Sequence, residues 1–250
     1  MPADPTRNAA RNRTEILERK ILLESRPVLF NIDTTGVCNI NPPCVFCTLK
    51  AGAYNYAQVD ALDFDKYGDF LPSAQKVIDC SFGEPLTRAD FSRVALSFLE
   101  RGQTFHFSTN GLLLDAARLA PLAPHASRLG IIVSTNAATP ETYRRLTGKD
   151  FDKLCANIRG AVAAFRQAGQ PAPLAMSMIV MRANRDEVLD FLRLVAALGV
   201  PRALLRHLFE TDYAAPPRDD FGYEFIYERE ILPPEDYAAV GAEAKVLAAS

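Results

Sequence analysis

The sequence predicts an α/β protein built as a partial (β/α)6 TIM-like barrel with parallel strands. Short apolar runs rich in β-branched residues alternate with helical stripes, which is the pattern of βαβ units. Six such units without a clear edge strand favour an open barrel over a flat sheet. The 250 residues are enough for one such domain. In a barrel of this kind the active site lies at the carboxyl ends of the strands.

Each predicted element has its own local signal. The strands are expected at residues 28–32, 76–79, 104–107, 128–133, 174–181 and 202–208. Between them, apolar stripes at helical spacing predict helices at residues 87–101, 112–122, 151–167 and 188–198, and one more that begins after Thr139. Thr139 is a good N-cap and Pro140 suits the first helical position. Gly102, Gly169 and Gly199 follow the ends of three of these helices.

The two ends of the chain break this rhythm. Residues 1–13 are polar and are expected to be a flexible start, with a helix over 14–25 capped by Thr14. The segment 211–230 is rich in proline, acidic and aromatic residues, and a helix is expected to open near Pro233. The predicted organisation is an N-terminal extension and helix (1–27), a core barrel (28–210), and a linker with the start of a C-terminal helical region (211–250). Because the sequence ends inside that helix, we expect the natural protein to be longer.

Charge and hydropathy exclude several classes of protein. The chain carries 28 Lys and Arg against 30 Asp and Glu, which gives a formal net charge of −2. This balance predicts no nucleic-acid partner and no membrane partner. No apolar run approaches the roughly 20 residues that span a bilayer, and the polar N-terminus lacks a signal sequence. A cytoplasmic location is therefore expected.

The most informative feature is a cysteine cluster directly after the first predicted strand. Cys38, Cys44 and Cys47 have the spacing Cys-x5-Cys-x2-Cys. Clustered cysteines in a cytosolic chain favour a metal centre over a disulfide, and thiolates suit soft metals. Structural zinc sites use four ligands, and no fourth Cys or His lies nearby in the sequence. Three cysteines on a 4Fe-4S cubane would leave one iron open to a ligand. A zinc knuckle and chance clustering stay as alternatives.

Polar motifs follow the next predicted strands in order. The second strand runs into residues 81–85, Ser-Phe-Gly-Glu-Pro, and the third ends in residues 108–111, Ser-Thr-Asn-Gly. Residues 134–136, Ser-Thr-Asn, close the fourth strand, and Ser177 lies in the fifth. Taken singly, each is compatible with an ordinary turn. Taken together, they would meet at one edge of a parallel barrel.

These motifs resemble those of the radical SAM superfamily. The cysteine loop, with Phe46 just before the third cysteine, resembles its cluster loop, and residues 83–85 resemble its Gly-Gly-Glu-Pro motif. Three departures stand out: the first gap in the cysteine loop has five residues instead of three, Phe82 replaces a glycine, and Asn136 replaces an acid. The core and the Pro-Pro-Glu helix resemble SPASM-type members, which modify peptides, sugars or other small molecules.

The resemblance implies cofactors and roles. Cys38, Cys44 and Cys47 would hold a 4Fe-4S cluster. The residues implied to bind S-adenosylmethionine (SAM) are Phe46, Gly83, Glu84, Ser108, Asn110, Ser134, Asn136 and Ser177. The reduced cluster would donate one electron to the sulfonium of SAM. The resulting 5′-deoxyadenosyl radical would take hydrogen from a small-molecule, sugar or peptide substrate. A flavodoxin or a ferredoxin-type protein would supply the electron.

Rival interpretations predict different chemistry. A zinc-stabilised binding module would hold zinc and no cluster. An iron–sulfur electron carrier would leave the Ser-Phe-Gly-Glu-Pro motif without a role. A catalytically silent barrel would keep the fold but lose the chemistry, and the longer first cysteine gap favours this version. The remaining cysteines, Cys80 and Cys155, are expected to be buried in the core.

Overall fold

The computed structural model describes residues 4–47, 70–208 and 218–249 and has a six-stranded parallel sheet at its centre. The strands are β1 Leu29–Ile32, β2 Lys76–Asp79, β3 Thr104–Thr109, β4 Leu129–Ser134, β5 Leu174–Val180 and β6 Ala203–His207. They lie side by side in sequence order, and every pairing is parallel. Among the described residues β6 does not pair with β1, so the barrel is partial and open, which confirms the predicted fold class.

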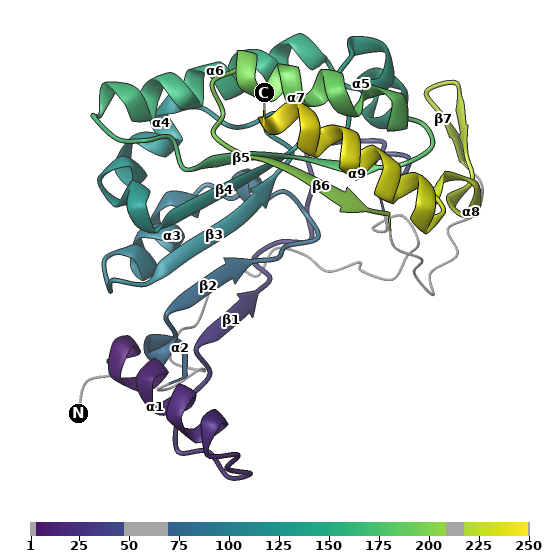
Figure 1. Ribbon diagram of the computed structural model, residues 1–250. Helices are drawn as coiled ribbons and strands as arrows, with labels where there is room; N and C mark the ends of the chain where they lie inside the picture. The colour runs from purple at the N-terminus through teal and green to yellow at the C-terminus, as the bar shows by residue number, and fades with distance from the viewer. Residues whose placement is uncertain (1–3, 48–69, 209–217, 250) are drawn as a thin grey trace.

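Helices follow the strands and cover the sheet (Figure 1). They are α1 Pro5–Leu17, α2 Phe70–Ser73, α3 Phe91–Leu99, α4 Ala116–Leu119, α5 Pro140–Thr147, α6 Phe151–Gln167, α7 Val188–Ala197, α8 Tyr227–Glu230 and α9 Pro234–Ala249. Thr139 caps α5 through its hydroxyl and Pro140 follows it, as the sequence predicts. The arrowheads of the strands point toward the side of the molecule where β7 and α8 lie, so the carboxyl ends of the strands share one edge.

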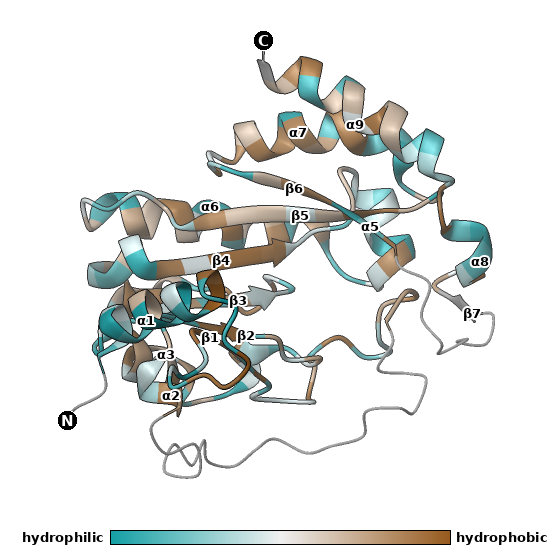
Figure 2. Ribbon diagram, turned by 60° about the horizontal axis from the view of Figure 1, so that its bottom comes forward, coloured by the Kyte–Doolittle hydropathy of each residue, from teal (hydrophilic) through white to brown (hydrophobic). Residues whose placement is uncertain are grey.

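The apolar core lies between the sheet and its helices. The ring centres of Phe98 and Phe105 are 5.4 Å apart, and those of Phe91 and Phe107 are 4.7 Å apart. All four rings are buried. Aromatic pairs at such spacings contribute roughly 0.5–1.5 kcal/mol beyond the burial of their area. This packing fixes β3, and with it the turn after Thr109, against α3. Figure 2 shows that the central strand β4 is hydrophobic and that α1 is largely hydrophilic.

The N-terminal prediction is wrong. The helix starts at Pro5, where the Asp4 carboxylate accepts hydrogen bonds from two main-chain N–H groups, and it ends at Leu17. Ile21 and Leu22, expected on its apolar stripe, are exposed. The predicted apolar stripe does not form a buried helix face, because polar contacts hold this segment in another conformation. The Asn8 amide donates to the main-chain oxygens of Arg26 (2.9 Å) and Ser73 (3.2 Å).

Two further helices are shorter than predicted. Residues 112–122 form only the short helix α4, whose N-cap is Asp115, followed by a 3-10 segment over Ala120–Arg128. Pro121 and Pro124 lack the N–H groups that an α-helix needs here. The helix predicted over 87–101 begins at Phe91, because Pro85–Thr87 forms a 3-10 turn of its own.

The C-terminal segment adds a small hairpin and a long helix. Strands β7 Arg218–Asp220 and β8 Tyr223–Phe225 pair antiparallel, and α8 and α9 follow. The helix expected near Pro233 is confirmed as α9. The division into extension, core and linker stays a prediction. Within the described ranges, the helices are too short or too polar to cross a lipid bilayer.

The longest helix offers a test of local capping. The Asp150 carboxylate accepts hydrogen bonds from Asp152 N (2.8 Å) and Lys153 N (3.1 Å) at the start of α6. We expect Asp150→Ala to lower the free energy of unfolding by about 1 kcal/mol, which corresponds to a fall in Tm of about 2–4 °C. Asp152→Ala, which removes a first-turn charge but not the cap, serves as the matched control. Equal losses in thermal denaturation would show that helix-dipole charge, not capping, stabilises α6.

Candidate functional site

The cysteine loop, residues 33–47, connects β1 to the carboxyl edge of the sheet. Its three cysteines are half-buried. Cys47 N donates to Cys44 O at 3.0 Å, so these two residues share one tight turn. Val45 N, between them, donates to Leu146 O of α5 at 2.9 Å. The second and third cysteines are thereby attached to the helix that follows β4.

The start of this loop is bound to the end of β2 through main-chain atoms. Gly83 N donates to Thr35 O at 3.0 Å, and Glu84 N donates to Val37 O at 2.8 Å. A Cβ added at Gly83 would lie 2.3 Å from Val37 O and 2.6 Å from Thr35 O. No side chain fits there, so the glycine is required by the approach of two backbones. The sequence prediction that Gly83 contacts SAM stays a prediction.

Glu84 lies beneath the loop and is buried. Its carboxylate accepts hydrogen bonds from Thr109 Oγ1 (2.8 Å), Asn110 N (2.6 Å) and Leu86 N (3.1 Å). Burial raises the pKa of Glu84, and these donors act in the opposite direction. Both carboxylate oxygens join the ends of β2 and β3. Its predicted contact with SAM stays a prediction.

Asn110 stands between the end of β3 and the cysteine loop. Its Nδ2 donates to Asn39 Oδ1 at 2.7 Å and to Cys38 Sγ at 3.7 Å. Ile40 N also donates to Cys38 Sγ, at 3.5 Å. Burial raises the pKa of Cys38, as do the negative charges of Glu84 and Cys47, while the two N–H donors lower it. Cys38 and Cys47 are thus close enough to interact electrostatically.

The ends of β4 and β5 meet beside these groups. Ser134 and Ser177 are paired in register, Ser134 half-buried and Ser177 buried. Ser177 O accepts hydrogen bonds from Thr135 N (2.9 Å) and Asn136 N (3.3 Å). Asn136 has a φ of +58°, a conformation that asparagine tolerates better than most residues. Its Oδ1 accepts from Ile179 N at 2.8 Å, so this side chain fixes the edge of the sheet.

A polar network that the sequence analysis missed supports the first turn of the cysteine loop. Thr34 Oγ1 donates to Asp79 Oδ2 at 2.6 Å, and Thr34 N donates to Ser81 Oγ at 2.8 Å. The buried Arg88 donates from Nη1 to Thr34 O at 3.0 Å and pairs with Asp90. An acid at the last position of the second strand, Asp79, was the signal that could have revealed this network.

The two remaining cysteines differ in their burial. Cys155 is buried in α6, as predicted. Cys80 is exposed, so its predicted burial is wrong. Successive strand residues face opposite sides, and the inward position here belongs to the buried Asp79.

The hairpin and α8 pack against the cysteine loop. Val45 belongs to a second buried apolar cluster, which comprises Val45, Leu146, Met181, Leu208, Phe225 and Tyr227. The Arg145 guanidinium lies 4.8 Å from the centre of the Tyr223 ring, and the Tyr223 hydroxyl donates to Glu230. The cluster joins Met181 after β5 and Leu208 after β6 to Val45 of the cysteine loop.

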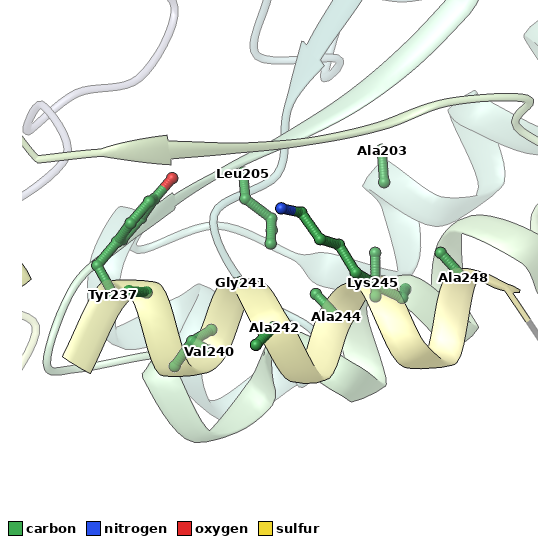
Figure 3. Close-up of a pocket in the computed structure, with 11 residues that line it drawn as sticks. Ala203, Leu205, Tyr237, Val240, Gly241, Ala242, Ala244, Lys245 and Ala248 are labelled. Carbon is green, nitrogen blue, oxygen red and sulfur yellow. The ribbon is translucent and has the colours of Figure 1, made fainter. Parts of the chain in front are cut away.

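A groove of about 640 Å³ lies elsewhere, between β6, α7 and α9 (Figure 3). It is lined mainly by alanine, leucine and valine, with the Lys245 amine and the Tyr237 hydroxyl at its wall. None of the predicted site residues contributes to this lining.

Comparison with known proteins identifies the family. Residues 32–203 match the model of the Radical SAM superfamily. This chain belongs to the radical SAM superfamily. Members of the superfamily use a 4Fe-4S cluster and SAM, in agreement with the cofactors that the sequence predicts.

Each match to a curated relative covers only part of that relative's length. "Probable GTP 3′,8-cyclase" of Saccharolobus islandicus (strain Y.N.15.51 / Yellowstone #2) is 31% identical over 175 residues, 68% of this chain and 53% of that protein. The Methanothermobacter thermautotrophicus (strain ATCC 29096 / DSM 1053 / JCM 10044 / NBRC 100330 / Delta H) protein of the same name is 29% identical over 170 residues, 66% of this chain and 53% of its own. The chain spans about half the length of the curated relatives it matches.

Solved structures share the fold. Streptococcus suis SuiB bound to S-adenosylmethionine has a TM-score of 0.67 at 15% identity, covering 95% of this chain and 51% of SuiB. The native anSMEcpe with bound AdoMet and Cp18Cys peptide has a TM-score of 0.61 at 15% identity, covering 87% and 58% of the two chains.

The cysteine loop offers three half-buried thiols, and thiolates are the ligands that iron–sulfur clusters use. The N–H donors on Cys38 Sγ are also typical of thiolates that ligate iron–sulfur clusters.

The contact between Gly83 and the cysteine loop generates a test. Gly83→Ala would push Cβ into two carbonyl oxygens, so we expect at least a tenfold loss of bound iron after anaerobic reconstitution. Gly160→Ala, in α6 at a position with no atom within 4 Å of the added Cβ, is the matched control and should retain its iron. Full iron and sulfide content in the Gly83 variant would contradict the role assigned to this glycine.

Proposed function

We propose that the protein is a radical SAM enzyme in which Cys38, Cys44 and Cys47 hold a 4Fe-4S cluster next to a SAM site. The observation that carries this proposal is the attachment of the cysteine loop to Gly83 and Glu84. This attachment brings the thiols of the cysteine loop to the carboxyl ends of β2 and β3, where parallel barrels bind their ligands.

Within this proposal the predicted SAM-site residues form two groups by side chain, and Gly83, which has no side chain, lies against the cysteine loop. Phe46, Ser108, Asn110 and Ser134 are half-buried, so their side chains can reach a bound ligand. Glu84, Asn136 and Ser177 are buried and hold the strand ends in place. The first group would contact SAM and the second would shape its site.

When bound, the reduced cluster and SAM supply a one-electron cleavage that yields a 5′-deoxyadenosyl radical. The chain's own part is to orient and to exclude water. The buried Glu84 and Asn136 keep the strand ends rigid. The apolar cluster around Val45 packs the hairpin against the cysteine loop, next to the residues that follow β5 and β6. A flavodoxin or ferredoxin-type donor would supply the electron.

The substrate is part of the proposal. The relatives are named for GTP, and another solved structure of the SuiB neighbour is bound to its precursor peptide SuiA. Identity near 30% with the first group, against 15% with the second, favours a nucleotide over a peptide.

The cysteine loop gives the direct test of the reaction. We expect the reconstituted, dithionite-reduced protein to form 5′-deoxyadenosine from SAM. The Cys38→Ala/Cys44→Ala/Cys47→Ala variant should lose activity at least a hundredfold, because these three thiolates are the proposed ligands to iron. Mass spectrometry of 5′-deoxyadenosine measures both. Cys80→Ser, which removes an exposed thiol outside the loop, is the matched control and should retain activity.

Three outcomes would overturn the proposal. A colourless protein with stoichiometric zinc would establish the binding module. A brown protein that leaves SAM intact would establish the electron carrier or the silent barrel. Equal activity of the triple variant would exclude the cysteine loop as the cluster site.

The substrate has its own test. With uniformly deuterated GTP we expect deuterium to appear in 5′-deoxyadenosine, because the radical takes a hydrogen atom from the substrate. Uniformly deuterated ATP, which shares the triphosphate but not the base, is the control. Formation of 5′-deoxyadenosine without deuterium would reject GTP while leaving the radical SAM proposal intact.

A further inference from the structure

The side chain of Asn110 faces the sulfur of the first loop cysteine. Its Nδ2 lies 3.7 Å from Cys38 Sγ, and the same nitrogen donates to Asn39 Oδ1 at 2.7 Å. An amide nitrogen carries two hydrogens, so one can serve each acceptor. The contact joins the turn after β3 to a residue 72 positions earlier in the chain.

The orientation of this amide is determined by the main chain around it. Leu112 N donates to Asn110 Oδ1 at 3.0 Å, which assigns the oxygen to that side and leaves the nitrogen toward the sulfur. Asn110 N donates to the buried Glu84 carboxylate at 2.6 Å. The main-chain N and the side-chain oxygen of Asn110 are therefore both held, and the amide donor points toward Cys38.

The sulfur receives a second donor from its own loop. Ile40 N lies 3.5 Å from Cys38 Sγ. Hydrogen bonds to cluster sulfurs stabilise the reduced, more negative state and so raise the reduction potential. The donor from Ile40 is a main-chain N–H, which only a substitution by proline would remove, with a change of the backbone. The donor from Asn110 can.

We infer that Asn110 is a positioning residue that tunes the reduction potential of the cluster through its amide donor to Cys38. This inference rests on the proposed function, because it requires Cys38 to be a cluster ligand. It gives Asn110 a role on the cluster in addition to the SAM contact that the family resemblance implies. Glu84 acts behind it by holding the Asn110 main chain.

A purely structural role for Asn110 would be to stabilise the turn. The chain offers a matched control for that role. Asn157 on α6 donates from Nδ2 to Gly111 O (2.9 Å) and Leu112 O (3.1 Å), so it supports the same turn from another helix. Asn157→Leu disturbs the turn and leaves the donor to sulfur in place.

Two variants remove the donor in different ways. Asn110→Asp keeps an oxygen for Leu112 N and replaces the amide nitrogen with a second oxygen. Asn110→Leu removes the donor without adding charge. An effect shared by both variants and absent from Asn157→Leu belongs to the donor itself.

The test is an EPR-monitored redox titration of the reconstituted 250-residue protein without SAM, with iron and sulfide content measured in parallel. We expect the ratio of reduced to oxidised cluster at fixed potential to fall about tenfold in both Asn110 variants, which is about 59 mV for a one-electron couple. Asn157→Leu should stay within about twofold of the unsubstituted protein.

The outcomes separate this inference from the function on which it rests. Absence of a 4Fe-4S cluster in the unsubstituted protein would overturn both. An intact cluster whose potential does not move in the Asn110 variants would overturn the tuning role alone. An equal shift in Asn157→Leu would assign the effect to the turn. Loss of the cluster in both Asn110 variants, with retention in Asn157→Leu, would make Asn110 an assembly residue and would likewise reject tuning.

Discussion

The two main-chain hydrogen bonds between the cysteine loop and the end of β2 are the constraint on which the site depends. They exist because residue 83 has no side chain, and an added Cβ would overlap two carbonyl oxygens. Further along, the loop is bound to α5 by the hydrogen bond from Val45 N to Leu146 O, so contacts with other elements fix it at both ends. Of the two residues that fix the loop, Glu84 also makes the buried contacts to the end of β3.

Buried polar groups connect this contact to the rest of the site. A buried carboxylate needs hydrogen-bond donors, and Glu84 finds them on the next strand. Those donors fix Asn110, and Asn110 in turn faces Cys38. The Asp79, Thr34 and Arg88 contacts serve the other end of the loop in the same way. Loss of one partner in such a network would leave a desolvated polar group, which costs roughly 1–3 kcal/mol.

The sequence predicted strands well because each is a short apolar run between punctuating turns, and β2 has the predicted bounds. It predicted the order of the polar motifs for the same reason. The sequence prediction failed where tertiary contacts determine the conformation of the chain. Asn8 and Glu15 hold residues 18–26 in an irregular conformation that no apolar stripe reveals. The directions of Glu84 and Asn136 also depend on partners from other strands, which local pattern cannot supply.

The cysteine loop has two faces, and different parts of the chain hold them. Cys38 is fixed from the side of β2 and β3 through polar contacts, whereas Val45, between the second and third cysteines, is fixed by apolar packing against Phe225 and Tyr227. Apolar packing tolerates small shifts that directional hydrogen bonds do not. Val45 is also held by a directional bond, from its main-chain N to Leu146 O, so both parts of the loop are fixed by the chain around them. A first gap of five residues is compatible with that arrangement, because it separates the two differently held parts.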